Sequence, residues 1–60
     1  MTKVKVTLIR SKIGVPERQK RTLNALGLRK INSFKIHNLT PQIEGMIKKV
    51  KHLIKVEYLN

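Results

Sequence analysis

Cysteine, aspartate and tryptophan are absent from this sequence of 60 residues, and glutamate occurs only three times. The lack of cysteine excludes disulfides, thiolate zinc sites and thiol nucleophiles. The histidines are His37 and His52, so few side chains remain that bind a metal in proteins. We therefore expect neither a bound metal nor a cofactor.

Long apolar runs are also missing, since no more than two apolar residues are consecutive, as in Leu8-Ile9. A transmembrane helix needs about 20 apolar residues. A secretory signal needs an apolar region of roughly 7–15 residues. We therefore expect a soluble protein that is not exported by such a signal, and the absence of cysteine agrees with a cytoplasmic location.

The small size limits how stable the chain can be alone. Sixty residues predict a single domain over residues 1–60, which buries only about 60% of the surface that its unfolded chain exposes. Such a core seldom supplies more than about 3–5 kcal/mol, and small domains gain further stability from disulfides, a metal or a partner. With the first two not expected here, a binding partner is the remaining source.

What the sequence has in excess is positive charge. Fourteen lysine and arginine residues against three glutamates give a formal net charge of +11 and a pI near 10.9. A polyanion would screen the repulsion among these charges and would stabilise the folded form by binding it. A nucleic acid is the favoured partner, and an anionic membrane surface is the alternative.

The basic residues are concentrated between residues 10 and 30, which include all four arginines. Arginine suits phosphate because its planar guanidinium donates two parallel hydrogen bonds. We interpret this stretch, a loop that leads into a short helix, as the main phosphate-binding surface. Its basic members are Arg10, Lys12, Arg18, Lys20, Arg21, Arg29 and Lys30.

Hydrophobic periodicity predicts five elements, in the order strand, helix, strand, helix, strand. Pro16 and Gly27 bracket the first helix, and Thr40 is the expected N-cap of the second. The expected elements are strands at 3–8, 31–38 and 53–59, with helices at 16–26 and from 41 onward. In the loop after the first strand, Ile13 or Val15 is expected to pack on the core.

The apolar positions of these elements define the expected core, in which both helices cover one face of a three-stranded sheet. On the second strand we expect Phe34 and Ile36 to face the helices. Their neighbours Lys35 and His37 then face water. The inward residues are Val4, Val6, Leu8, Gln19, Thr22, Leu23, Leu26, Phe34, Ile36, Ile43, Met46, Ile47, Val50, Ile54, Val56 and Tyr58.

The N-terminus of the first helix is a candidate phosphate site. Pro16 at the first helical position makes Val15 the N-cap, and a valine side chain cannot accept a backbone hydrogen bond. The free N–H groups and the positive end of the helix dipole favour an anion near Gly14 and the backbone of Glu17. The alternative is that the Glu17 carboxylate occupies this position.

Gly45 is expected on the outer face of the second helix, where glycine costs about 1 kcal/mol relative to alanine. One interpretation is that a nucleic-acid backbone approaches the helix closely there. The other is that the glycine is simply tolerated. The first interpretation predicts that Gly45→Leu weakens RNA binding more than folding.

Catalysis is not expected, because the three glutamates are scattered and no P-loop, dinucleotide motif or nucleophile–base pair is visible. The two aromatic residues, Phe34 and Tyr58, are both expected to face inward, so base stacking should be minor. Recognition of the backbone and shape of folded, double-helical RNA fits better. No two-helix motif for DNA recognition is visible.

Two segments carry a family resemblance, RSKIGVPERQKRTLNALGLRKIN over residues 10–32 and TPQIEGMIKKVKHLIKV over residues 40–56. They look like the stretch after the first strand, and the second helix with the last strand, of the bacterial large-subunit ribosomal protein L-thirty family (universal uL-thirty). The most specific shared pieces are Arg10-Ser11, Ile13-Gly14, Gly27-Leu28-Arg29, Gly45-Met46-Ile47 and His52-Leu53.

The resemblance implies an α+β fold of order β-α-β-α-β, half of a ferredoxin-like arrangement. Its three-stranded antiparallel sheet has strand 1 in the centre and two helices on one face, whereas spacing alone favours parallel crossovers. It further implies a non-enzymatic structural constituent of the large (50S) ribosomal subunit, in a bacterium or an organelle. The implied partner is large 23S-type rRNA, with no membrane, small-molecule substrate or homo-oligomer.

The residues expected to contact RNA combine the charge pattern with this resemblance. They are Arg10, Ser11, Lys12, Gly14, Arg18, Lys20, Arg21, Arg29, Lys30, Gly45, Lys49 and His52. The alternative function is a free basic nucleic-acid-binding or membrane-active protein that is not part of the ribosome. A free binder would wash off as salt rises, whereas a ribosomal protein would sediment with large subunits at moderate salt.

Overall fold

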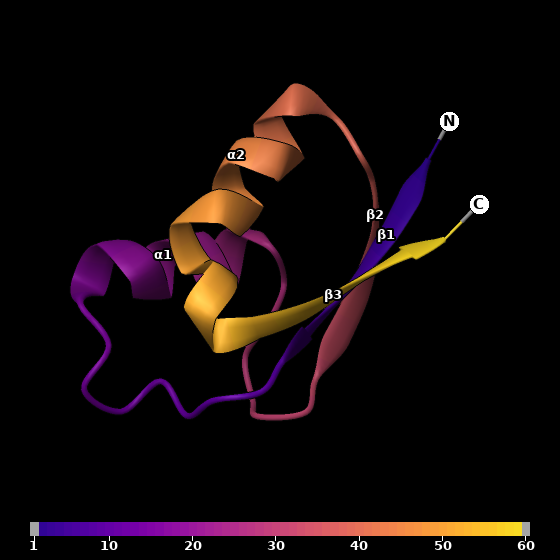
Figure 1. Ribbon diagram of the computed structural model, residues 1–60. Helices are drawn as coiled ribbons and strands as arrows, with labels where there is room; N and C mark the ends of the chain where they lie inside the picture. The colour runs from indigo at the N-terminus through magenta and orange to yellow at the C-terminus, as the bar shows by residue number, and fades with distance from the viewer. Residues whose placement is uncertain (1, 60) are drawn as a thin grey trace.

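A computed structural model describes residues 2–59 of the chain. The elements follow the predicted order (Figure 1). They are β1 (Lys3–Leu8), α1 (Glu17–Ala25), β2 (Phe34–Asn38), α2 (Pro41–Val50), a single 3-10 turn η1 (Lys51–Leu53) and β3 (Ile54–Leu59). β2 begins three residues later than expected, because Lys30–Ser33 form a turn in which Asn32 has a positive φ of 70°.

The three strands form one antiparallel sheet in the order β2-β1-β3, so β1 is the central strand. Both helices lie on the same side of this sheet, and the opposite face is left uncovered (Figure 1). The α+β fold implied by the family resemblance is therefore confirmed. The parallel crossovers that spacing alone favoured are not what the chain forms.

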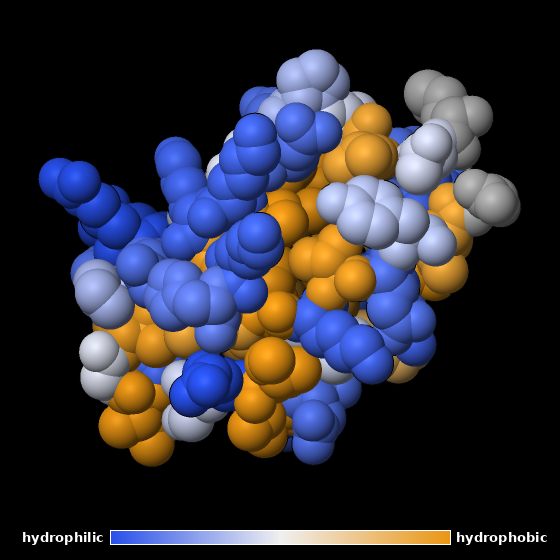
Figure 2. Space-filling model, viewed as in Figure 1, coloured by the Kyte–Doolittle hydropathy of each residue, from blue (hydrophilic) through white to orange (hydrophobic). Residues whose placement is uncertain are grey.

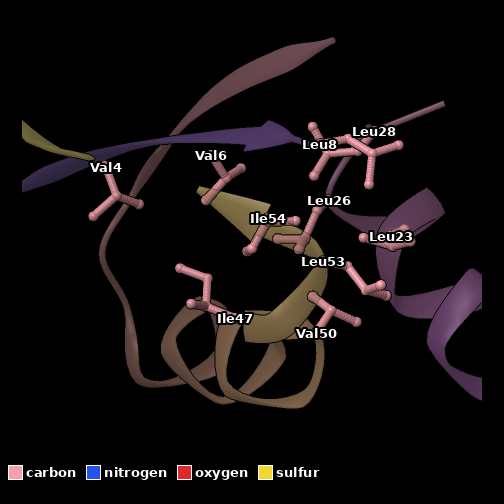
Figure 3. Close-up of a cluster of buried hydrophobic side chains, with 10 residues drawn as sticks. All are labelled: Val4, Val6, Leu8, Leu23, Leu26, Leu28, Ile47, Val50, Leu53 and Ile54. Atoms are coloured by element: carbon pink, nitrogen blue, oxygen red, sulfur yellow. The ribbon is translucent and has the colours of Figure 1, made fainter. Parts of the chain in front are cut away.

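The core lies between the sheet and the helices, where ten buried side chains point toward one another (Figure 3). β1 contributes every second residue, as its strict alternation predicts. The ten are Val4, Val6, Leu8, Leu23, Leu26, Leu28, Ile47, Val50, Leu53 and Ile54, and Val15, Leu39, Ile43, Met46 and Val56 pack around them. Val15 thus anchors the loop that leads into α1, as expected of either Ile13 or Val15.

The prediction for the faces of β2 is wrong. Phe34 and Ile36 are each 53% exposed, and they lie on the uncovered face. The register shows why, because Val4 pairs with His37 and Val6 pairs with Lys35. Residues directly opposite in an antiparallel pair point to the same side, so the lysine and the histidine lie on the helix side with the two buried valines.

The backbone at the end of α1 explains this choice of face. The carbonyl oxygen of Leu26 can only accept a hydrogen bond, so Nε2 of His37 carries the proton and donates to it at 2.8 Å. His37 is half-buried and not simply solvated as expected. The aliphatic part of Lys35 lies against Gly27. The helix-side face of β2, an edge strand, is therefore covered by the backbone at the end of α1 and by the aliphatic part of Lys35. This face needs no apolar side chain of its own.

Tyr58 lies on the helix side of β3, like Ile54 and Val56, but it is 68% exposed. The prediction that the Tyr58 side chain points to the helix side is therefore correct, but the side chain is not buried. Tyr58 lines an open apolar groove between α2 and β3 together with Leu39, Ile47 and Val56. Figure 2 shows this apolar seam beside the hydrophilic side chains of the helices.

The helix ends agree with their predicted signals to within one residue. Pro16, and not Val15, is the N-cap of α1, and no side chain caps this end. At α2, the hydroxyl oxygen of Thr40 accepts from the N–H of Ile43 at 3.2 Å, as the sequence predicts for an N-cap. Gly27 ends α1 with a φ of +84°, the left-handed conformation expected of its C-terminal glycine.

Replacing Gly27 by alanine is expected to destabilise the free chain by about 1–2 kcal/mol, because a Cβ is disfavoured in the left-handed region. A Cβ there would also lie 2.9 Å from Cγ of Lys35. The matched control is Gly45→Ala, which has open space around it and should stabilise α2 by about 1 kcal/mol. Urea unfolding of the two variants should therefore show opposite shifts; a shift of the same sign in both would contradict the argument.

Candidate nucleic-acid interface

The basic loop between β1 and α1 is held in shape by its own hydrogen bonds. The hydroxyl oxygen of Ser11 accepts from the N–H of Ile13 at 3.2 Å. The N–H of Val15 donates to the carbonyl oxygen of Lys12 at 3.1 Å, and Gly14 supplies a φ of +81°. Such a loop loses less conformational entropy when it binds a ligand.

Lys12 ties this loop to the far end of α1. Its Nζ donates to Oδ1 of Asn24 at 2.7 Å. Lys12 thus has an internal partner that the sequence did not indicate, and this partner is a neutral amide. The side chain of Ile13, in contrast, is 90% exposed at the tip of the loop.

Four predicted residues meet in a depression that we call the loop hollow. Arg10, Ser11 and Gly14 of the loop line it together with His52 of η1. Nε2 of His52 lies 3.2 Å from Oε1 of Gln19, which links η1 to α1. The remaining lining residues are Ile9, Ile13, Val15, Pro16, Gln19, Ile31 and Leu53.

A second depression, the interhelical hollow, lies between α1 and α2. Arg18 and Arg21 of α1 and Lys49 of α2 line it, with Gln19 and Thr22 between them. Lys49 is far from the two arginines in the sequence, and no carboxylate lines the hollow. Figure 2 shows hydrophilic side chains covering the surface over α1 and α2. An anionic group that enters this hollow would therefore be attracted by positive charge from both helices.

A third depression, the turn hollow, lies where α1 turns into β2. Arg29 and Lys30 line it, as does Lys35. Lys35 was not among the predicted contacts, because its placement depends on which face of β2 meets the helices. The other lining residues are Asn24, Gly27, Ser33 and Phe34.

Three predicted contacts lie outside these three hollows, namely Lys12, whose partner is Asn24, together with Lys20 and Gly45. Lys20 is half-buried on α1, and Gly45 is exposed on α2 with no atom within 4 Å of where a Cβ would stand. Carboxylates do not neutralise the predicted basic residues: within residues 2–59 the two ion pairs are Glu44 with Lys48 and Glu57 with Lys55. The positive charge of the hollows is therefore free to act on a ligand.

Other kinds of site leave little trace in the described part of the chain. Across residues 2–59, no three histidine or glutamate side chains gather as a metal-binding group. No helix among these residues is long and apolar enough to cross a membrane.

Comparisons with known proteins place this surface in a family context. The family described as Ribosomal protein L30p/L7e matches residues 4–54. The chain is 54% identical over 57 residues to the large ribosomal subunit protein uL30 of Rubrobacter xylanophilus, covering 95% of this chain and 93% of that protein. It is 56% identical over 57 residues to the protein of the same name from Thermosipho africanus, with the same coverage.

A third relative, the large ribosomal subunit protein uL30 of Porphyromonas gingivalis, is 52% identical over 56 residues, which cover 93% of this chain and 97% of that protein. The residues that line the three hollows all lie within the segment 4–54 that the family matches.

Proposed function

This chain belongs to the ribosomal protein L30p/L7e family, and we propose that it is a structural, non-enzymatic constituent of the large ribosomal subunit that binds folded large-subunit rRNA. The observation that carries the proposal is the interhelical hollow, in which Arg18, Arg21 and Lys49 converge without a carboxylate. Guanidinium and ammonium groups gathered from two helices suit phosphates of a folded RNA backbone.

The three hollows and the surface between them form the proposed RNA interface. Phosphate contacts position a protein on RNA, so the recognition is of backbone and shape. The proposed contacts are Arg10, Ser11, Lys12, Gly14, Arg18, Lys20, Arg21, Arg29, Lys30, Gly45, Lys49 and His52. The uncapped start of α1, near Gly14 and the backbone of Glu17, stays a predicted position for one phosphate.

The finer features of this function are part of the same proposal. We infer that the chain acts as one domain on 23S-type rRNA within the 50S subunit, without a membrane, a small-molecule substrate or a second copy as partner. The ribosome in question is cytoplasmic, with an organellar ribosome as the alternative. The net charge of +11 supports a polyanionic partner, since RNA contacts would relieve the self-repulsion of the free chain.

Sedimentation with large subunits tests the proposal. Labelled chain added during subunit assembly should sediment with the large subunit and stay bound through washes at moderate salt. The other candidate, a free basic nucleic-acid or membrane binder, would be released progressively, since each neutralised duplex phosphate contributes about −0.9 to the logarithmic salt slope. Loss of the chain at the first moderate-salt wash would contradict the ribosomal function.

Ile13 offers a further check on the loop. Because its side chain is 90% exposed, Ile13→Ser should leave the stability of the free chain unchanged within about 0.5 kcal/mol. If RNA covers the loop tip, the same substitution should weaken RNA binding by about 1–2 kcal/mol, or roughly 5- to 30-fold, through lost apolar burial. Filter binding to rRNA fragments and urea unfolding measure the two quantities; unchanged affinity would place the loop tip outside the interface.

A further inference from the structure

The uncovered face of the sheet is the part of the molecule that the proposed phosphate contacts do not use. The register places Lys5 of β1 between Ile36 of β2 and Glu57 of β3 on this face. Thr7 lies between Phe34 and Lys55 in the same way. No helix covers these side chains, because α1 and α2 both lie on the opposite side (Figure 1).

Phe34 and Ile36 give this face an apolar patch along its edge strand β2. Each keeps 53% of its surface exposed, although the solvated face of an antiparallel sheet usually carries polar side chains. A contiguous exposed apolar patch is a feature of interaction surfaces. The ring of Phe34 lies on an open sheet face, which is where some RNA-binding domains carry the aromatic rings that stack on unpaired bases.

The charges around the ring indicate the chemistry of the partner. Nζ of Lys5 lies 4.4 Å from the centre of the Phe34 ring, a cation–π contact. Lys55 pairs with Glu57 at 3.9 Å, which leaves Lys5 without a carboxylate partner within residues 2–59. An apolar protein segment would gain little from an aromatic ring that an ammonium group overlies, whereas an anionic partner gains from that charge.

Phe34 also connects this face to the proposed RNA interface. It lines the turn hollow with Arg29, Lys30 and Lys35. An RNA strand that rests its phosphates on those cations therefore has the Phe34 ring beside it. The Lys5 side chain is flexible, so its ammonium group can leave the ring for a neighbouring phosphate when another planar group takes its place.

We propose that Phe34 is a stacking platform for one unpaired rRNA base, with Arg29 and Lys30 on the strand's phosphates to one side and Lys5 on the other. This inference rests on the proposed function, in that the partner is rRNA, and it adds base stacking to the recognition of backbone and shape. It also reverses the expectation that base stacking is minor, which depended on Phe34 pointing inward.

Chemical probing of reconstituted large subunits tests the platform. Subunits assembled with wild-type chain, Phe34→Ser or Phe34→Trp are compared by nucleotide-resolution probing of unpaired bases. Phe34→Ser should raise the reactivity of one or two unpaired nucleotides by at least about fivefold, because stacking on an aromatic ring is lost. Phe34→Trp should restore the protection, and the footprint of α1 and its loop should stay the same in all three.

Ile36→Ser is the matched control, since Ile36 has the same exposure on the same strand and no ring. It should leave those nucleotides protected. Unchanged nucleotide reactivity with Phe34→Ser, or an equal rise with Ile36→Ser, would overturn the stacking platform. The proposed function would still stand in that case, provided that the wild-type chain gives its footprint on the rRNA. A photoreactive phenylalanine analogue at position 34 that cross-links to a protein and not to rRNA would also overturn it. Failure of the wild-type chain to enter subunits would instead remove the proposed function, and the platform with it.

Discussion

Replacing Arg18 and Arg21 together by alanine is expected to lower the affinity for large-subunit rRNA by about 30-fold near 0.15 M salt. If each arginine neutralises one duplex phosphate, the double substitution lowers the magnitude of the logarithmic salt slope by about 1.8. If the two proteins bind equally near 1 M salt, this difference in slope gives an affinity difference of about 30-fold at 0.15 M salt. Both side chains are exposed and line the interhelical hollow, so the fold should be unaffected. Filter binding across a salt series measures the slope.

The control removes the same charge from another part of the surface. Lys48 and Lys51 line the apolar groove between α2 and β3, away from the interhelical hollow, and Lys48 pairs with Glu44 at 3.8 Å. The double variant Lys48→Ala with Lys51→Ala should change the slope much less than the arginine variant. Equal changes in the two variants would mean that total charge, and not the placement of Arg18 and Arg21, determines binding.

Leu26→Ala is expected to leave the free chain largely unfolded. Leu26 is completely buried at the centre of the core, where it meets residues of both helices and the sheet (Figure 3). Truncating such a leucine costs about 2–5 kcal/mol, and a core of this size supplies only about 3–5 kcal/mol in total. Thermal unfolding followed by circular dichroism should show a low, broad transition or none.

The exposed Ile13 provides the comparison for this core substitution. Ile13→Ala removes a similar volume from a side chain that is 90% exposed, and it should shift the transition only slightly. Because RNA binds the folded form, rRNA fragments should restore part of the helical signal of Leu26→Ala by mass action. A wild-type transition in Leu26→Ala would contradict the proposed share of this leucine in the core.

Much of the fold could be predicted because local patterns decide it. The alternation of β1 predicted its buried face, and Gly27 and Thr40 predicted helix ends through backbone conformation and capping. The stripe of α2 predicted Ile47 and Val50 in the core. The antiparallel direction was not predictable from spacing, and it came from the family resemblance.

Tyr58 illustrates a different limit of sequence patterns. Alternation along β3 predicted its side of the sheet correctly, but burial also depends on how far α2 extends over that side. The candidate interface shows a similar limit. Charge density predicted most of its residues, but Lys35 was missed and Phe34 was placed inward, because the sequence did not show which face of β2 meets the helices.

The sequence by itself determined the elements, the buried face of the central strand and the excess of positive charge, since each follows from residues close together in the chain. Only the tertiary structure decided which side of β2 meets the helices and which cations share a hollow. An alternating strand specifies two faces but not their direction, and that direction comes from pairing with β1 and from His37 bonding to the backbone of Leu26. Lys49 likewise joins Arg18 and Arg21 only because α2 packs beside α1.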